Sequence, residues 1–109
     1  MSRPDDRRLE TRSPANARGV VVAPGLELAC LIVDQSSTGV RLRLDRNLAL
    51  PARVVLIDVA QATAVEAEVV WRKGQEAGVK RSGAASSLRG LIPSRLAAAR
   101  DALMRAGGR

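Results

Sequence analysis

Short apolar runs separated by turn residues fill the middle of the chain. In the third of these runs, Val40, Leu42 and Leu44 face one way. Arg41 and Arg43 face the other way, which is the period-two pattern of a strand with one buried face. Breaks rich in Gly, Pro, Asp and Ser recur at spacings of roughly 8–12 residues, as in all-β domains. The pattern predicts six strands, over residues 19–23, 28–33, 40–44, 54–57, 65–71 and 77–80.

The fifth run also predicts which side of its strand is buried. Its inward residues are predicted to be Val65, Ala67, Val69 and Trp71, and its outward residues Glu66 and Glu68. Short strands of this kind favour a small antiparallel barrel or sandwich over βαβ units. Closing the sheet also removes the exposed edges that valine-rich strands would otherwise present, so we expect a mainly β fold.

The two ends of the chain differ from this middle part. Residues 1–16 are polar and hold nothing that buries apolar surface, so we expect a mobile arm there. A barrel is expected over residues 17–81. Residues 82–109 are expected to form a connecting segment followed by a helix.

The expected helix lies within residues 93–105, which are rich in helix-forming residue types. Ser94 is a candidate N-cap, and Gly107 stands just past the end. The apolar stripe at helical spacing consists of Leu96, Ala99 and Leu103, with Met104 as a fourth candidate. We expect this stripe to pack on the barrel.

The charge of the chain is concentrated at its ends. Eighteen basic and 11 acidic residues give a formal net charge of +7. Residues 19–71 are slightly acidic, and the segments on either side carry the basic excess. This distribution suits an anionic partner that the terminal segments contact.

Several classes of function lack the residues that they require. The chain has no His, which excludes a Cys–His or Ser–His catalytic pair and a histidine metal site, so we expect no enzyme. Cys30, the single cysteine, stands in an apolar run and is expected to be buried and inert. No apolar stretch approaches the ~20 residues of a membrane span. The charged N-terminus lacks the apolar segment of a signal peptide, so we expect a cytoplasmic protein.

Three arginines of the polar arm are the first candidate for binding chemistry: Arg7, Arg8 and Arg12. By itself, such a group is a solvated basic tail. The guanidinium group is nevertheless suited to two-pronged contacts with phosphate and to stacking on a nucleobase. An arm that carries three of them can wrap a compact anion if binding offsets the cost of ordering it.

The second candidate is the polar turn that holds Asp34, Ser36 and Gly39. These residue types are ordinary turn formers. They also suit a ledge that reads guanine, because a carboxylate accepts hydrogen bonds from the N1–H and N2–H₂ edge of the base. A hydroxyl adds another bond, and glycine lets a ligand approach the backbone. A cationic arm opposite such a ledge would fit a dianionic guanine nucleotide.

The two candidates together resemble a known family. Arg8-x-x-x-Arg12, followed 22 residues later by Asp34-x-Ser36-x-x-Gly39, resembles the paired RxxxR and (D/N)xSxxG motifs of PilZ domains. The later segments 69–72 and 76–79 are similar to the fifth and sixth strands of the family. The sixth strand departs from the family pattern because Gly78-Val-Lys-Arg81 has no aromatic residue after Gly-Val-x.

The resemblance implies a six-stranded antiparallel PilZ-type β-barrel with a C-terminal α-helix. It implies a receptor that binds cyclic di-GMP without turning it over and needs no cofactor. Arg8 and Arg12 would grip phosphate and guanine groups, and the Asp34, Ser36 and Gly39 turn would form the ledge. Arg7 would allow a second, stacked ligand molecule by offsetting its charge. The signal would pass to a separate, unidentified protein when the arm orders against the barrel.

Two alternatives remain open. One is a basic nucleic-acid-binding module, favoured by the charged ends. Against it, Trp71 is the one aromatic residue and is predicted to point inward, which leaves no platform for stacking bases. The other is a PilZ-like module that works through protein contacts without ligand. The intact motif residues argue against this second alternative.

Overall fold

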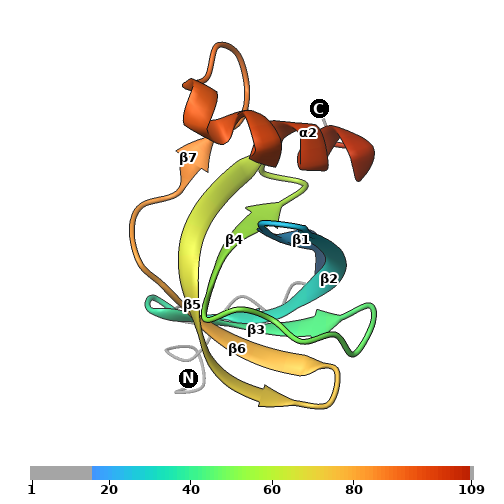
Figure 1. Cartoon of the computed structure of the whole chain (residues 1–109). Coiled ribbons are helices and arrows are strands. Elements are labelled where there is room, and N and C mark those ends of the chain that lie inside the picture. The colour runs from blue at the N-terminus through green and yellow to red at the C-terminus, as the bar shows by residue number, and fades with distance from the viewer. Residues whose placement is uncertain (1–15, 109) are drawn as a thin grey trace.

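In the computed structural model, which describes residues 16–108, a closed antiparallel barrel carries a helix across one end (Figure 1). The barrel strands are β1 (Ala17–Ala23), β2 (Leu26–Gln35), β3 (Gly39–Leu44), β4 (Arg53–Asp58), β5 (Thr63–Lys73) and β6 (Glu76–Arg81). Their order is β4-β1-β2-β3-β6-β5, and pairing of β4 with β5 closes the ring. The six predicted strands, the barrel and the C-terminal helix are confirmed.

The barrel interior is filled by aliphatic side chains from every strand. The alternation in β3 is as predicted, since Val40, Leu42 and Leu44 are buried and the two arginines between them are exposed. The other buried members of this cluster are Val21, Leu28, Cys30, Ile32, Val54, Leu56, Val65, Ala67 and Val79. Branched side chains fit the pleated inner surface well, so a barrel of this size packs without aromatic residues.

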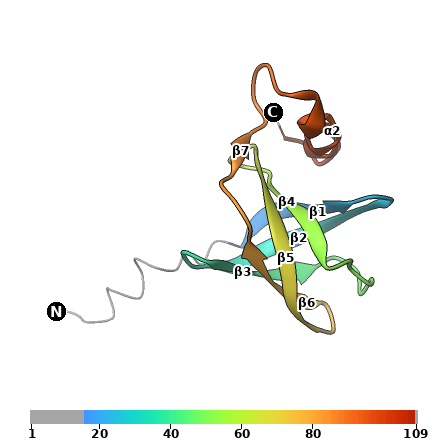
Figure 2. The same cartoon turned by 60° about the vertical axis from the view of Figure 1, so that its left-hand side comes forward.

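A second apolar cluster joins the helix to the outside of the barrel. It contains Val20 of β1, Ile57 of β4 and Leu88, together with the buried face of the helix. The helix begins with a 3-10 turn, η1 (Ser94–Leu96), and continues as α2 (Ala97–Arg105). Figures 1 and 2 both place α2 across the same end of the barrel.

The face of the helix that is buried differs by one residue from the predicted stripe. Leu96, Ala99 and Leu103 are buried as expected, but Met104 is 54% exposed. Ala102 is buried in its place. At about 100° per residue, position 102 lies only about 60° around the helix from Ala99, whereas position 104 lies about 140° from it and faces away from the barrel. Ser94 makes no capping hydrogen bond with its side chain, so its prediction as an N-cap is wrong.

The end of the helix follows a Schellman motif. Gly107, at a φ of +90°, is the left-handed residue that the motif requires. Its N–H donates to the carbonyl of Met104 at 3.1 Å, and the N–H of Gly108 donates to the carbonyl of Leu103 at 2.9 Å. Gly107 therefore ends the helix, as predicted.

Polar contacts also hold the C-terminal end of the helix. Arg105 donates to Glu27 of β2, with a shortest N···O distance of 2.6 Å. The hydrogen bond from Arg105 lowers the pKa of the Glu27 carboxyl below its ordinary value. Arg18 of β1 donates to the carbonyl of Ala106. Among residues 16–108, no helix is long and apolar enough to span a bilayer.

The register of β5 changes near its C-terminal end. Its pairing with β6 shifts between Val69 and Trp71, which marks a β-bulge. Val70 is 55% exposed and Trp71 is 42% exposed, so the prediction that Trp71 points inward is wrong. A bulge adds one residue to a strand, and the side chains beyond it no longer follow the alternation set before it.

The segment between β6 and η1 has a short strand of its own. This strand, β7 (Ser86–Ser87), pairs with the first two residues of β5. Leu88, which follows it, is 2% exposed and packs under the helix. The segment expected to connect the barrel with the helix is thereby held against the barrel.

Candidate functional site

The turn between β2 and β3 borders an open pocket of about 450 Å³. The strands β3 and β6, which carry part of its lining, lie on the opposite side of the barrel from α2 in Figures 1 and 2. The residues that line it come from β2, the turn after it, β3, β5 and β6: Asp34, Gln35, Ser36, Thr38, Gly39, Val40, Arg41, Val70, Trp71, Gly78, Val79 and Lys80. Asp34, Ser36 and Gly39, which the sequence singled out, thus lie on one pocket. We call residues 34–39 the ledge.

Local hydrogen bonds shape the ledge. The N–H of Ser36 donates to the carbonyl of Gly39 at 2.9 Å. The N–H of Gly39 donates to the Ser36 hydroxyl oxygen at 3.2 Å. A Cβ on Gly39 would lie 3.5 Å from the Val79 carbonyl oxygen and 4.0 Å from the Ser36 hydroxyl. Both are ordinary van der Waals distances, so a Cβ would fit at Gly39 beside the Val79 carbonyl and the Ser36 hydroxyl.

Asp34 stands where β2 departs from regular pairing. The register with β3 shifts between Ile32 and Asp34, and Asp34 is then opposite Arg41. Both residues line the pocket, as does Lys80 of β6. One carboxylate and two cationic side chains therefore border the same space, which suits a ligand with both hydrogen-bond donors and negative charge.

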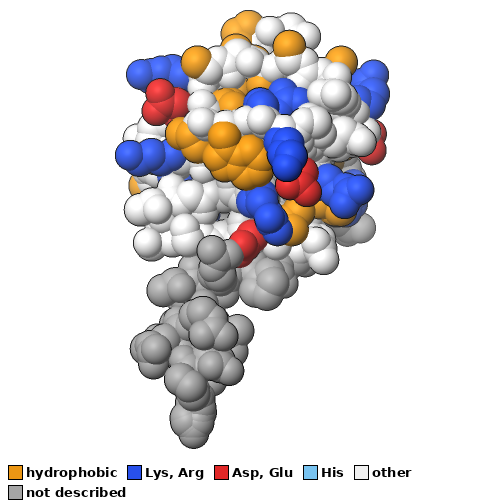
Figure 3. Space-filling model, turned by 90° about the horizontal axis from the view of Figure 1, so that it is seen from below, with side chains coloured by type: hydrophobic (Ala, Val, Ile, Leu, Met, Phe, Trp, Pro, Cys, Tyr) orange, Lys and Arg blue, Asp and Glu red, His pale blue; other side chains and the backbone are white. Residues whose placement is uncertain are grey.

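Trp71 adds an aromatic surface to the pocket. Its indole lies directly against the backbone of Gly78 on the neighbouring strand, since a Cβ at Gly78 would be 1.9 Å from the indole nitrogen. The ring is held by this contact and still has 42% of its surface exposed. Figure 3, which looks onto the β6 side of the barrel, shows an apolar patch bordered by basic and acidic side chains.

The exposure of Trp71 is the feature of the site that sequence reasoning missed. A signal was present, because Val69, Val70 and Trp71 are three consecutive apolar residues and cannot all alternate. The exposed indole offers one surface on which a base can stack. Trp71 is nevertheless the one aromatic residue in the chain, and unspecific binding of single strands stacks successive bases on several rings, which disfavours a nucleic-acid-binding module.

Arg81 is a second residue that the sequence did not assign to the site. It is the last residue of β6, and its guanidinium donates to the Ser36 carbonyl and to the Gln35 side-chain oxygen, each at 2.7 Å. Gln35 and Ser36 both belong to the ledge, whereas Arg81 is not among the residues that line the pocket.

The two arginines of the first motif, Arg8 and Arg12, and Arg7 immediately before it lie outside the described residues. The described chain nevertheless starts close to the ledge. Ala17, the first residue of β1, pairs with Ile32, which is two residues before Asp34. The segment that precedes β1 is therefore joined to the barrel beside the ledge.

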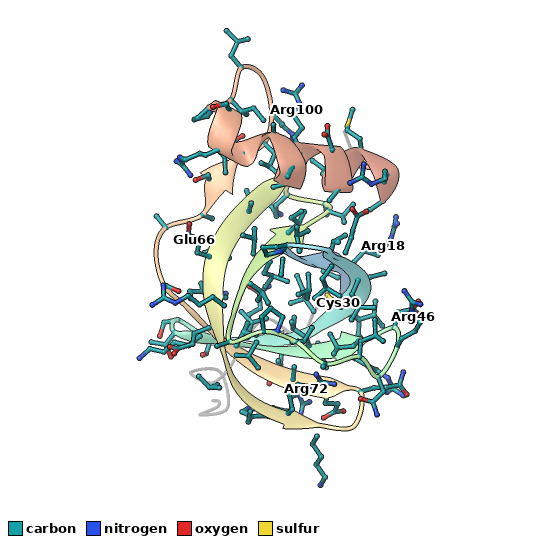
Figure 4. The ribbon with its side chains drawn as sticks, viewed as in Figure 1. Arg18, Cys30, Arg46, Glu66, Arg72 and Arg100 are labelled. Atoms are coloured by element: carbon teal, nitrogen blue, oxygen red, sulfur yellow. The ribbon has the colours of Figure 1, made fainter. Side chains whose placement is uncertain are left out.

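Reactive groups are not gathered at this site. Cys30 is buried in the barrel interior (Figure 4), where burial raises its pKa from 9.0 to about 12. The thiol is thus protonated at neutral pH and unreactive, as expected. Among residues 16–108, no group of three or more His, Cys, Asp or Glu side chains could hold a metal ion.

The barrel, its helix and the polar ledge define a small binding module. The chain belongs to the PilZ domain family, because the model of the PilZ domain matches residues 6–92. PilZ domains are generally modules that bind cyclic di-GMP. Comparison with curated proteins gives no match, and comparison with solved structures gives none either.

Proposed function

We propose that the protein is a cytoplasmic receptor for cyclic di-GMP that binds the ligand on the ledge and signals to a separate protein. The observation that carries this proposal is that Asp34, Ser36 and Gly39 line one pocket together with the exposed Trp71. The family supports it, because these residues match the second PilZ motif in a chain whose first motif lies within the matched region.

The pocket offers a separate contact for each part of the ligand. The Asp34 carboxylate accepts hydrogen bonds from the N1–H and N2–H₂ groups of a guanine. The indole of Trp71 offers a flat face on which a guanine stacks. Lys80 also lines the pocket, and its positive charge would offset that of a phosphate.

The arm completes the site in this proposal. Arg12 is five residues before Ala17, and five residues of chain span at most about 17 Å. Because Ala17 lies beside the ledge, Arg8 and Arg12 are within reach of a ligand bound there. The arm then orders over the ligand and changes the surface that a partner meets, and Arg7 offsets the charge of a second ligand molecule.

Titration calorimetry of the full chain tests the proposal. We expect binding of cyclic di-GMP, much weaker binding of cyclic di-AMP and GTP, and recovery of the ligand unchanged. Arg8→Ala should abolish binding and leave the melting temperature unchanged. A folded protein that gives no heat with cyclic di-GMP would refute the receptor and favour a module that acts through protein contacts alone.

Two variants, each with one aspartate replaced by alanine, test whether the ledge binds the guanine. Asp34→Ala should lower the affinity by about 30-fold, as expected when hydrogen bonds to a charged group are lost. It should also lower the preference for guanine over adenine dinucleotides. Asp45→Ala is the matched control, because Asp45 is exposed at the other end of β3 and does not line the pocket. Equal loss for guanine and adenine ligands would exclude the guanine-reading role of Asp34.

A further inference from the structure

Arg81 ties the ledge to the barrel wall. Its Nη1 donates to the Ser36 carbonyl and its Nη2 to the Gln35 Oε1, and both distances are 2.7 Å. Its own backbone N–H donates to the Thr38 carbonyl at 3.1 Å. A single residue at the end of β6 therefore contacts three of the six positions of the ledge.

These bonds differ in kind from the other hydrogen bonds of the ledge. The bonds between Ser36 and Gly39 are local and fix the shape of the turn. The bonds from Arg81 cross from another strand, 45 residues away from Ser36, and fix where the turn stands relative to β6. Since Gly78 and Lys80 of β6 line the same pocket, this relative position decides the width of the pocket.

The side chain of Arg81 contacts residues of the ledge without lining the pocket itself. It is half-buried and is not among the pocket-lining residues, whereas its acceptor Gln35 is. The planar guanidinium carries two parallel donors, which reach a carbonyl oxygen and an amide oxygen at once in a fixed geometry that the compact ammonium group of lysine does not have.

We propose that Arg81 is a positioning residue that holds the ledge in its ligand-binding shape before the ligand arrives. The inference rests on the proposed function and adds the residue that prepares the site. A ledge that is already fixed loses less conformational freedom on binding, so the affinity is higher than with a loose turn.

The chain provides a matched control in Arg72, which is labelled in Figure 4. Arg72 anchors a different loop through the same kind of contacts. It donates to the Leu48 carbonyl at 2.7 Å and to the Asn47 side-chain oxygen at 3.1 Å. Arg72→Met thus removes the same charge and these bonds, together with bonds from Arg72 to the carbonyls of Gly74 and Glu76 in its own hairpin, but leaves the contacts of Arg81 with the ledge in place.

The first measurement needs no ligand. Amide hydrogen exchange of the full chain should be about tenfold faster at Ser36 and Gly39 in Arg81→Met than in the wild type, because the turn opens more readily. Arg72→Met should leave exchange at these two amides unchanged and accelerate it at Leu48, whose N–H donates to the Arg46 carbonyl. Unchanged exchange at the ledge in Arg81→Met would overturn the proposal.

The second measurement is calorimetry with cyclic di-GMP at low and high salt. Arg81→Met should bind about tenfold more weakly than the wild type, and Arg72→Met about as tightly as the wild type. Arg81→Lys keeps the charge but lacks the two-pronged geometry, so it should recover only part of the affinity. The difference between Arg81→Met and the wild type should persist at high salt, which screens charge but does not alter the shape of the ledge.

The outcomes separate the two proposals. A wild-type protein that does not bind cyclic di-GMP refutes the receptor function, and the exchange measurement still decides whether Arg81 fixes the ledge. If the wild type binds and Arg81→Met binds equally well, the positioning role is wrong. Full recovery with lysine, or a difference that disappears at high salt, would show an effect of charge alone and would also overturn it.

Discussion

At the end of the barrel that α2 covers, the helix and the outer faces of β1 and β4 share one buried apolar cluster. On the side that carries the ledge, polar groups and an exposed indole surround an open pocket. The first region is held by burial, and the second by a few directed hydrogen bonds. The residues that stabilise the helix end and those of the proposed binding site therefore lie in different parts of this small fold, so that a change in one region should leave the other largely intact.

The largest expected effect is on stability at the helix end. Leu103 is 1% exposed in the helix cluster, and Leu103→Ala should lower the free energy of unfolding by about 3 kcal/mol. Chemical denaturation measures this loss. Met104→Ala is the matched control, since Met104 is 54% exposed and should cost little. If Leu103→Ala weakened binding at a temperature where the variant is still folded, the separation of the two regions would be wrong.

The barrel interior provides the next effect, which depends on pH. Burial raises the pKa of the Cys30 thiol from 9.0 to about 12. Between these values the unfolded chain has released the proton and the folded chain still binds it, so stability falls as the pH rises. The loss should reach about 2 kcal/mol near pH ~10.5.

Denaturation of the wild type and of Cys30→Val over this alkaline range measures the effect. Valine has no proton to release, so its stability should fall less steeply above the ordinary pKa of a thiol. If the free energy of unfolding fell equally with pH in the two proteins, the pKa of the Cys30 thiol would not be raised by burial. Ligand affinity should be the same in both proteins, because Cys30 is not among the residues that line the pocket.

On the ledge side, the indole should affect binding and not stability. Trp71→Ala should weaken the binding of cyclic di-GMP by about tenfold, the typical worth of stacking a base on an aromatic ring. Gly78→Ala should have a similar effect, because its Cβ would be 1.9 Å from the indole nitrogen and would displace the ring. Calorimetry measures the affinity of both variants for cyclic di-GMP. An unchanged affinity in Trp71→Ala would show that Trp71 does not contact the ligand.

The smallest effect is expected at the ion pair between Arg105 and Glu27. The pair is largely exposed, so Arg105→Gln should lower the melting temperature only slightly, and less at high salt. Because Arg105 lowers the pKa of Glu27, the contribution of the pair is complete above the ordinary pKa of a glutamate. It is lost as the pH falls through the lowered value. An acid titration that shows the same slope for wild type and Glu27→Gln would exclude this contribution.

Much of the fold could be predicted from the sequence, because the barrel follows the rule of alternation. The buried and exposed sides of β3 came directly from Val40 to Leu44, and the residues of the second motif are close together because a turn joins them. The run Val69-Val70-Trp71 showed that the alternation must break, but not which of its side chains would turn outward, and so the exposure of Trp71 was missed. Arg81 was missed because its contact with Ser36 depends on the pairing of β3 with β6, two strands that are far apart in the sequence.

Trp71, which lines the pocket, makes the protein suitable for fluorescence measurements. The chain has no Tyr and no Phe, so all of its intrinsic ultraviolet fluorescence comes from one indole, and that indole stands at the pocket. Emission from the unlabelled protein therefore reports on the ledge without background from the core. The native chain carries its own optical probe, placed where a bound base would quench it.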